Sequence, residues 1–345
     1  MKEVKMGGRF VGDGHPVLIS LEAGATHTGI ESAKQLSKAA ADGSADAIKW
    51  QTVNADLLMT DHSQMVKYTT ADGEENEESI YEALKRRELS RDEWHELKDY
   101  CDGLGLLFIS TPDSIESIDL LVEIGADALK VSKSDINHFY MVDYMARTGK
   151  TIILDGREKF DDVERCVQIC ESHGVDNIII MHCPSGYPAQ HAGIHLSTIT
   201  QIKNIFGYPA AYSDHSVGNT MNYAAIALGA SMIEKTITLD KGTDAVEHSM
   251  SIEPHEVSEF VERTRAVQAA LGDPRIIFNS RVKPDLRRSI FAKHDIAKGR
   301  RLALDDLDFR RPGTFYSAQY YEAVIGQEMN RDLKAGEPIM PHDLQ

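Results

Sequence analysis

The 345-residue sequence is poor in cysteine, has no long apolar run and carries no excess of basic residues. Its four cysteines show neither a paired disulfide framework nor a zinc spacing, which favours a reducing compartment. No apolar stretch approaches the roughly 20 residues that span a bilayer. The N-terminus also lacks the apolar core of a signal peptide. We therefore expect a cytoplasmic protein without a membrane partner.

Positive charge is scarce, because 37 basic residues face 54 acidic ones, for a formal net charge of −17. Nucleic-acid binding requires concentrated Lys and Arg, so we expect no nucleic-acid partner. The imbalance lies before Arg275, where 44 acidic residues outnumber 24 basic ones, whereas the remainder holds 13 basic and 10 acidic residues. A site for an anionic ligand in the acidic part must therefore be locally basic.

Eight short apolar runs cross the chain, and helical patterns such as 33–41 and 115–124 lie between most of them. Runs of this length are typical of strands buried on both faces of a parallel sheet. Eight β-then-α units predict an α/β fold, the closed (β/α)8 TIM barrel, whose catalytic groups lie at the C-terminal ends of the strands. The runs cover residues 17–24, 47–52, 106–112, 128–134, 151–157, 177–185, 210–216 and 232–238.

Nearly every apolar run ends in side chains that ionise or form hydrogen bonds. A barrel with only a structural role has little reason to place so many polar groups on one rim. The sequence therefore predicts an enzyme. The rim residues are Glu22, Lys49, Gln51, Ser110, Thr111, Lys130, Asp155, Arg157, His182, Ser213, Asp214, His215, Glu234 and Lys235.

A smaller β-rich domain is expected after the last barrel helix, which ends near Leu271. We assign residues 1–275 to the barrel and 276–345 to this second domain. The second domain contains a repeat with an offset of 37 residues, in which each half predicts a short strand, a Gly turn and a second short segment. The repeated residues are Asp295, Ile296, Gly299, Leu302, Asp306 and Leu307, matched by Asp332, Leu333, Gly336, Ile339, Asp343 and Leu344.

The connection between the second and third strands is unusually long. It contains a polar segment from Thr60 to Glu78, followed by an amphipathic helix from Ser79. Long loops on this rim are often lids or substrate contacts. A solvated acidic insertion is the alternative interpretation.

Several lysines are expected to converge at the rim. Lys49, Lys130 and Lys235 lie in or at the ends of predicted strands, and Lys133 is close by. A buried ammonium requires a partner anion, and a phosphate or carboxylate ligand would supply it. The alternative for Lys235 is a buried ion pair with Glu234 that orients the lysine.

Three further residues are candidates for acid–base or metal chemistry. Glu22 ends the first strand beside glycines that let a ligand approach the backbone. His215 follows an aspartate at the seventh strand, which suits a metal ligand or a proton shuttle, although such a histidine is often structural. Glu247 precedes Ser251, the expected N-cap of the last barrel helix, and capping does not explain its presence.

Taken together, these segments resemble the N-acetylneuraminate (sialic acid) synthase family, including its spore-coat polysaccharide relatives, over almost the whole chain. Each match is short, but their order is specific. The tail resembles the antifreeze-like (SAF) domain that these enzymes carry. The motifs are Glu22-Ala-Gly-Ala-Thr-His27-Thr-Gly29, Lys49-Trp-Gln51, Ser110-Thr-Pro112, Met181-His-Cys-Pro-Ser-Gly-Tyr187-Pro188, Tyr212-Ser-Asp-His215 and Arg310-Arg-Pro-Gly313.

The resemblance implies that phosphoenolpyruvate condenses with a sugar aldehyde to give a nonulosonic acid and phosphate. It also implies a homodimer in which Arg311 of one tail domain reaches the sugar bound by the partner. A divalent cation, Mn or Mg, on His215 would polarise the aldehyde oxygen. The implied phosphoenolpyruvate ligands are Lys49, Thr111, Lys130 and Ser213. The residues implied to face the sugar are Glu22, Gln51 and Tyr187. The expected substrate-binding set is completed by Lys133, Arg157, Ser185, Lys235 and Glu247.

The sequence departs from the family pattern at the metal and phosphate sites. Thr236 replaces the second metal histidine, and Lys133 replaces a serine. The phosphate-binding segment becomes Asp155-Gly-Arg157-Glu158. Lys133 and Arg157 would substitute positive charge for serine hydroxyls, so an anion would bind in a different orientation. We expect a divergent member with an altered acceptor or a weaker dependence on metal.

Two alternatives stay open at this stage. A Schiff-base aldolase would use one rim lysine as its nucleophile. A degenerate relative would bind a sugar or phosphate without catalysis, in keeping with the lost histidine and the altered 155–158 segment.

Overall fold

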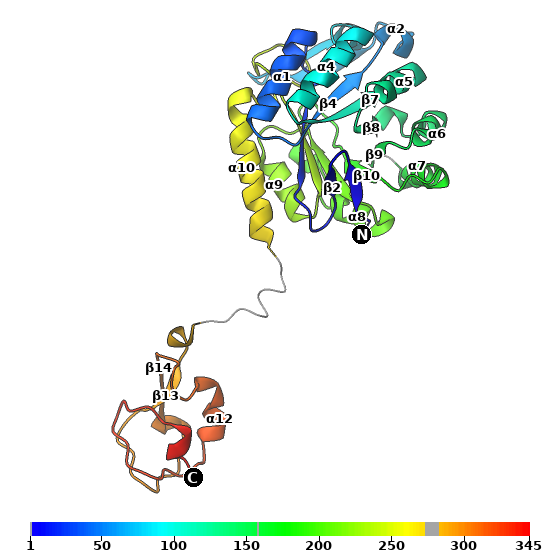
Figure 1. Cartoon of the computed structure of the whole chain (residues 1–345). Coiled ribbons are helices and arrows are strands. Elements are labelled where there is room, and N and C mark those ends of the chain that lie inside the picture. The colour runs from blue at the N-terminus through cyan, green and yellow to red at the C-terminus, as the bar shows by residue number, and fades with distance from the viewer. Residues whose placement is uncertain (1, 157–158, 273–282) are drawn as a thin grey trace. The chain divides into compact units, whose positions relative to one another are not determined.

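The computed structural model describes residues 2–156, 159–272 and 283–345. It divides into two compact units, Met1–Gly272 and Asp273–Gln345 (Figure 1). No helix in the described ranges is both long enough and apolar enough to cross a bilayer.

Unit 1 is a closed barrel of eight parallel strands, which confirms the predicted TIM barrel. The strands follow each other around the barrel in chain order, and β12 closes it against β3. Each of the eight apolar runs forms one strand. The strands are β3 (Leu18–Glu22), β4 (Ala47–Thr52), β7 (Leu107–Pro112), β8 (Ala128–Val131), β9 (Thr151–Asp155), β10 (Ile178–His182), β11 (Ala210–Asp214) and β12 (Met232–Thr236).

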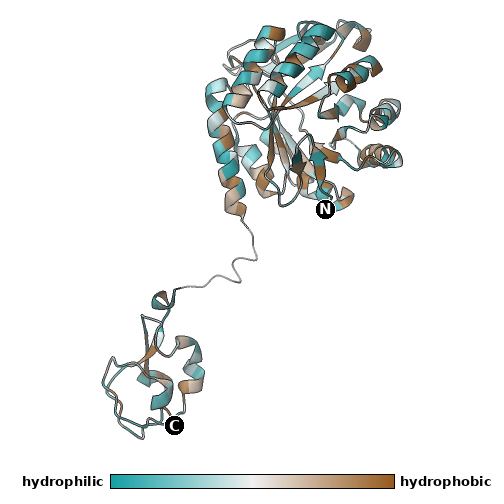
Figure 2. Cartoon of the chain, in the orientation of Figure 1, coloured by the Kyte–Doolittle hydropathy of each residue, from teal (hydrophilic) through white to brown (hydrophobic). Residues whose placement is uncertain are grey.

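A ring of helices surrounds the strands, with apolar residues on the faces turned toward the sheet (Figures 1 and 2). Cys166 and Cys170 lie on one of these helices and are buried, in agreement with a packing role. The helices are α1 (Ile30–Asp42), α4 (Arg91–Gly103), α5 (Ile115–Glu123), α6 (Phe139–Arg147), α7 (Phe160–Ser172), α8 (Thr198–Phe206), α9 (Thr220–Ala227) and α10 (Pro254–Leu271).

Side-chain alternation along the strands divides the core into two parts. One set packs outward against the helices, and the other fills the barrel interior. The N-terminal hairpin of β1 (Val4–Met6) and β2 (Arg9–Val11) joins the interior set through Val4, Met6 and Val11, which are fully buried. Apolar side chains therefore fill one end of the barrel, and the polar inward-facing residues lie toward the C-terminal ends of the strands.

The long connection between β4 and β7 is structured. It consists of α2 (Ala55–Leu58), a hairpin of β5 (Met65–Thr69) and β6 (Glu75–Ser79), and α3 (Ile80–Lys85), with Ser79 as N-cap. We call residues 55–87 the insertion. The Tyr68 hydroxyl donates to Asp244 Oδ1 at 2.8 Å, and the Thr69 amide donates to the Tyr187 carbonyl at 2.9 Å. These bonds attach the insertion to the loops after β12 and β10.

In unit 2 the two halves of the sequence repeat make equivalent contacts. It contains β13 (Ser289–Ala292), β14 (Leu307–Arg310) and α12 (Tyr321–Val324). The Lys298 amide donates to Asp332 Oδ1 at 2.7 Å, and 37 residues later the Ala335 amide donates to Asp295 Oδ1 at 2.9 Å. Each half of the repeat therefore caps a turn of the other half, and the two halves form one core.

Candidate active site

A cavity of about 730 Å³ opens at the C-terminal ends of the barrel strands. Its floor is formed by inward-facing strand residues, and part of its wall comes from the insertion. The cavity contains most of the residues expected from the sequence. Those that line it are Glu22, Lys49, Gln51, Thr111, Lys130, Lys133, Asp155, Ser185, Tyr187, His215, Glu234 and Glu247.

Two lysines and two glutamates form a buried network at the cavity floor. The Lys49 ammonium is ion-paired with Glu22 and lies 3.8 Å from Glu234 Oε1. The Lys130 ammonium lies 3.2 Å from the same Glu234 oxygen, to which the Ser213 hydroxyl donates at 2.8 Å. One carboxylate oxygen on β12 therefore connects this strand to β4, β8 and β11.

Opposing effects set the protonation of this network. Burial alone would raise the pKa of Glu234, but the ammonium groups of Lys130 and Lys49 lower it to about 2. Burial lowers the pKa of Lys49 to about 8, although Glu234 opposes the shift. Burial also acts to lower the pKa of Lys130, but the carboxylates of Glu234 and Asp155 raise it above its ordinary value. Around pH 7 all three groups are charged.

His215 presents one ring nitrogen to this floor. Its Nδ1 lies 3.0 Å from the Pro184 carbonyl oxygen, and its Nε2 lies 3.4 Å from the Ser213 hydroxyl. The Lys133 ammonium donates to the Ser185 hydroxyl at 3.2 Å, and the Gln51 amide donates to Glu22 at 3.5 Å. These groups give the cavity donors and acceptors on several sides.

Lys235 does not line the cavity. It lies beside Glu234 on β12, so alternation directs the two side chains to opposite faces of the barrel wall. Its ammonium is 3.0 Å from Asp214 Oδ2 and also donates to the carbonyl oxygens of Ser216 and Gly218 at 2.6 and 2.9 Å. Its partner is therefore Asp214 and not Glu234, and we do not retain Lys235 as a substrate ligand.

Among the described residues, Arg311 and Ser213 were also expected at the site and do not line the cavity. Arg157 falls outside the described residues. Arg311 is exposed on unit 2, and Thr236 is buried on β12. Ser213 is buried at the floor, where it contacts Glu234.

Arg87 is a cavity residue that the sequence did not single out. It follows α3, is only 4% exposed and lines the cavity wall. From the sequence it cannot be told apart from the adjacent Arg86, because both lie at the end of an amphipathic helix in a charged segment. The α3 packing that buries Arg87 is a tertiary feature.

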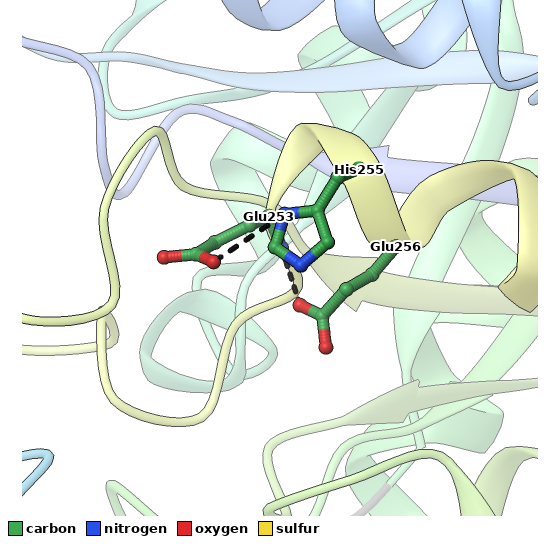
Figure 3. A group of neighbouring side chains, drawn as sticks. All are labelled: Glu253, His255 and Glu256. Carbon is green, nitrogen blue, oxygen red and sulfur yellow. Dashed lines mark hydrogen bonds and ion pairs between the residues drawn. The ribbon is translucent and has the colours of Figure 1, made fainter.

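One group of metal-ligating side chains lies close together in the described chain: Glu253, His255 and Glu256, at the start of α10 (Figure 3). None of the three lines the cavity. Glu253, and not the expected Ser251, is the N-cap, and its amide donates to Glu256 Oε2 at 2.8 Å. Glu256 is also ion-paired with Lys241, and the Lys241 amide donates to Glu253 Oε1 at 2.9 Å. Helix capping accounts for both carboxylates.

Comparison with known proteins gives two family matches. Residues 36–275 match the model described as the NeuB family, and residues 287–345 match the model described as the SAF domain. Together they cover most of the chain, and the second match confirms the expected type of tail domain.

Individual relatives agree with these matches. An uncharacterized protein of Methanocaldococcus jannaschii is 34% identical over 100% of this chain and 99% of its own length. The N,N'-diacetyllegionaminic acid synthase of Campylobacter jejuni is 32% identical over 93% of this chain and 98% of its own. The crystal structure of the Bacillus subtilis spore coat polysaccharide biosynthesis protein SpsE is 28% identical, with a TM-score of 0.68, and the match covers 100% of this chain and 99% of SpsE.

The position of Lys235 predicts a large effect on stability. Substituting Lys235→Met leaves the buried Asp214 carboxylate without its cation, which costs about 3 kcal/mol of unfolding free energy. Urea denaturation followed by circular dichroism measures the loss. Lys38→Met is the matched control, since Lys38 pairs with Asp42 at 2.9 Å on the surface, where such a pair contributes about 0.5 kcal/mol or less. Equal losses in both variants would contradict this role for Lys235.

Proposed function

Because the chain belongs to the NeuB family, we propose that it is a synthase that condenses phosphoenolpyruvate with a sugar aldehyde to give a nonulosonic acid and free phosphate. In this reaction the methylene carbon of the enol bonds to the aldehyde carbon. Water adds to the carbon that carries the phosphate oxygen, and inorganic phosphate leaves. The product is a keto acid three carbons longer than the aldehyde.

The observation that carries this proposal is the charged network at the cavity floor. Lys49 and Lys130 are buried cations beside an open cavity, and Lys133 lies on its wall. The two buried lysines already have carboxylate partners, so a ligand anion would share them with Glu22 and Glu234 rather than fill an empty cationic site. Lys130 and Lys133, with Thr111, would hold the phosphate and carboxylate of the enol and orient its methylene carbon.

The proposed acid–base roles belong to Glu22 and its ion-pair partner Lys49. Glu22 is 3% exposed and lines the cavity, with Gln51 as a hydrogen-bond partner. In the proposed reaction Glu22 would move a proton to or from the acceptor oxygen, and the paired Lys49 would stabilise negative charge that develops there. Gln51 and Tyr187 would position the sugar.

The proposal predicts phosphate release that depends on an aldose. Purified protein with phosphoenolpyruvate and a panel of N-acylated, phosphorylated and unmodified aldoses should release phosphate with at least one acceptor. Lys130→Met should lower kcat/KM about 100-fold or more, because the enol loses a buried charge-assisted contact. Lys150→Met, away from the cavity lining, is the matched control. If no acceptor supports release from the folded wild-type protein, the synthase proposal fails and the non-catalytic alternative is favoured.

A Schiff-base aldolase is the second candidate function. The specific observation in its favour is the lowered pKa of Lys49, about 8, since a neutral amine is required for attack on a carbonyl. The two carboxylates beside Lys49 oppose this role because they hold the amine charged near neutral pH. Covalent trapping of a keto acid by borohydride, detected by mass spectrometry, separates the aldolase from the synthase.

A divalent metal on His215 is part of the family expectation, and the cavity residues do not form a site for it. Thr236 stands where the second histidine is expected. Within the described ranges, the cavity contains no group of three His, Cys, Asp or Glu ligand atoms close enough together to hold an ion. Two of the cavity carboxylates, Glu22 and Glu234, are engaged by lysines. We therefore derive no step through a metal.

This arrangement predicts a weak response to chelation. Dialysis against EDTA should lower phosphate release by less than about twofold, because the lysine network needs no metal to keep its charge. Re-addition of Mn²⁺ or Mg²⁺ to the dialysed protein provides the comparison. Loss of activity on dialysis and full recovery with either ion would show instead that His215 and substrate oxygens complete a metal site.

We also propose the family's homodimer, in which Arg311 of the partner's tail domain contacts the sugar. Arg311 is exposed on unit 2, so a second subunit could contact its guanidinium. Substitution of Arg311 in one subunit would then lower activity only at the site of its partner.

Complementation in mixed dimers tests this arrangement. Arg311→Ala and Lys130→Met should each be nearly inactive alone. Co-expression of the two should restore about a quarter of wild-type activity overall, because about half of the dimers are mixed and each mixed dimer has one intact site of two. Arg301→Ala with Lys130→Met is the control pair. Absence of recovery in purified heterodimers would contradict a site shared between subunits.

A further inference from the structure

The cavity wall contains a buried guanidinium that the proposed reaction does not use. The Nε and Nη2 atoms of Arg87 are buried and have no hydrogen-bond partner among the described residues. Buried polar groups in proteins are nearly always hydrogen-bonded, and an exception beside a cavity indicates a missing ligand. Arg87 therefore requires an acceptor that the chain itself does not supply.

Neighbouring carboxylates do not fill this role. Glu78 accepts from both terminal nitrogens of Arg86, at 2.6 and 3.1 Å, and from the Val246 amide at 2.8 Å. Burial lowers the pKa of Arg87, and Glu247 is close enough to oppose this shift, yet the Nε and Nη2 atoms of Arg87 form no hydrogen bond with Glu247 or any other described residue. Both Arg87 and Glu247 line the cavity.

Glu247 is held in place by its backbone. Its φ of 74° lies in the left-handed region, which is uncommon for a residue with a side chain. The Ser251 hydroxyl donates to its carbonyl oxygen at 2.6 Å, and the preceding amide is bound by Glu78. The backbone that carries the Glu247 side chain is thus held in one conformation, and this side chain lines the same cavity as Arg87.

Arg87 and the enol-binding lysines come from different elements that line the same cavity. Tyr187 is within electrostatic reach of both Lys130 and Arg87: Glu247 and burial raise the pKa of Tyr187, and the two cations oppose the rise. Arg87 belongs to the insertion, whereas Lys130 belongs to strand β8 at the floor. An acceptor whose aldehyde meets the enol at the floor would reach Arg87 with its remote end.

The surroundings favour an uncharged group at this remote end. A phosphate would contact Arg87 but would be repelled by the Glu247 carboxylate. An amide satisfies both residues, because its carbonyl accepts from Arg87 and its N–H donates to Glu247. Its acyl methyl would then contact the apolar part of the wall, which consists of Leu58, Val66, Ile80, Ala83, Leu84 and Val246.

We propose that Arg87 is a specificity-determining residue that hydrogen-bonds the carbonyl oxygen of an uncharged acylamino group on the acceptor sugar, at the end remote from the aldehyde. Glu247 accepts from the amide N–H of the same group. The inference rests on the proposed function in taking the ligand to be the acceptor. It predicts that the chain prefers acceptor sugars with a distal amide over sugars with a terminal phosphate.

Direct titration of the full chain tests the assignment without turnover. The probes are a 2,4-diacetamido hexose, N-acetylmannosamine, which lacks the distal amide, and N-acetylmannosamine 6-phosphate. The diacetamido sugar should bind wild-type protein at least about 10-fold more tightly than the other two, the discrimination given by one charge-assisted hydrogen bond. Arg87→Met should abolish that preference, and Arg87→Lys should retain part of it.

Steady-state kinetics gives the second readout. Arg87→Met should raise KM for the diacetamido sugar about 10-fold and change kcat less than about threefold, since Arg87 contacts no reacting atom. Arg91→Gln is the matched control, because Arg91 is an exposed arginine on α4 that pairs with Glu123. Circular dichroism verifies that each variant is folded. Tighter binding of the phosphorylated sugar, or equal weakening of all three sugars in Arg87→Met, would overturn the assignment.

The two proposals fail in different ways. If no acceptor yields phosphate, the synthase proposal falls, and the binding titration still measures whether Arg87 selects an amide. If phosphate is released but the Arg87 variants discriminate like the wild type, only the assignment of Arg87 falls.

Discussion

The structure depends on one shared carboxylate oxygen, Glu234 Oε1, between the ammonium groups of Lys49 and Lys130. Taking an isolated charge out of water is unfavourable by several kcal/mol, so each of these groups remains charged only because the others are present. The closed barrel supplies the geometry, since β4, β8 and β12 direct these side chains into one interior. The proposed anionic substrate would thus meet a set of charges that the fold has already brought together.

The same constraint determines where specificity can arise. The floor is built from strand residues whose positions are fixed by the barrel hydrogen bonds, whereas the outer wall comes from the insertion and the loop that carries Glu247. The insertion residues that line the wall take no part in the ion pairs of the floor. In the proposed reaction the anionic enol and the acceptor would be recognised by separate parts of the chain, which suits a family whose named relatives are synthases of different sugar acids.

Much of this arrangement follows from the sequence. The eight apolar runs became the eight strands, and most of the polar residues at their ends line one cavity. Strict alternation along β12 also directs Glu234 and Lys235 to opposite faces, so the outward position of Lys235 could have been predicted from the sequence. The sequence could not predict that Glu253 and not Ser251 is the N-cap. Both residue types can accept from a helix amide, and they lie only two residues apart.

The sequence by itself determined the barrel, the repeat in the tail and the chemical character of the cavity floor, because these depend on periodic patterns and on residues within or directly after strands. Only the tertiary structure decided which ions pair, that Lys235 is bound to Asp214, and that Arg87 is buried with unused donors. Such properties depend on side chains far apart in the chain and on the water that packing excludes from them, and no local pattern encodes either.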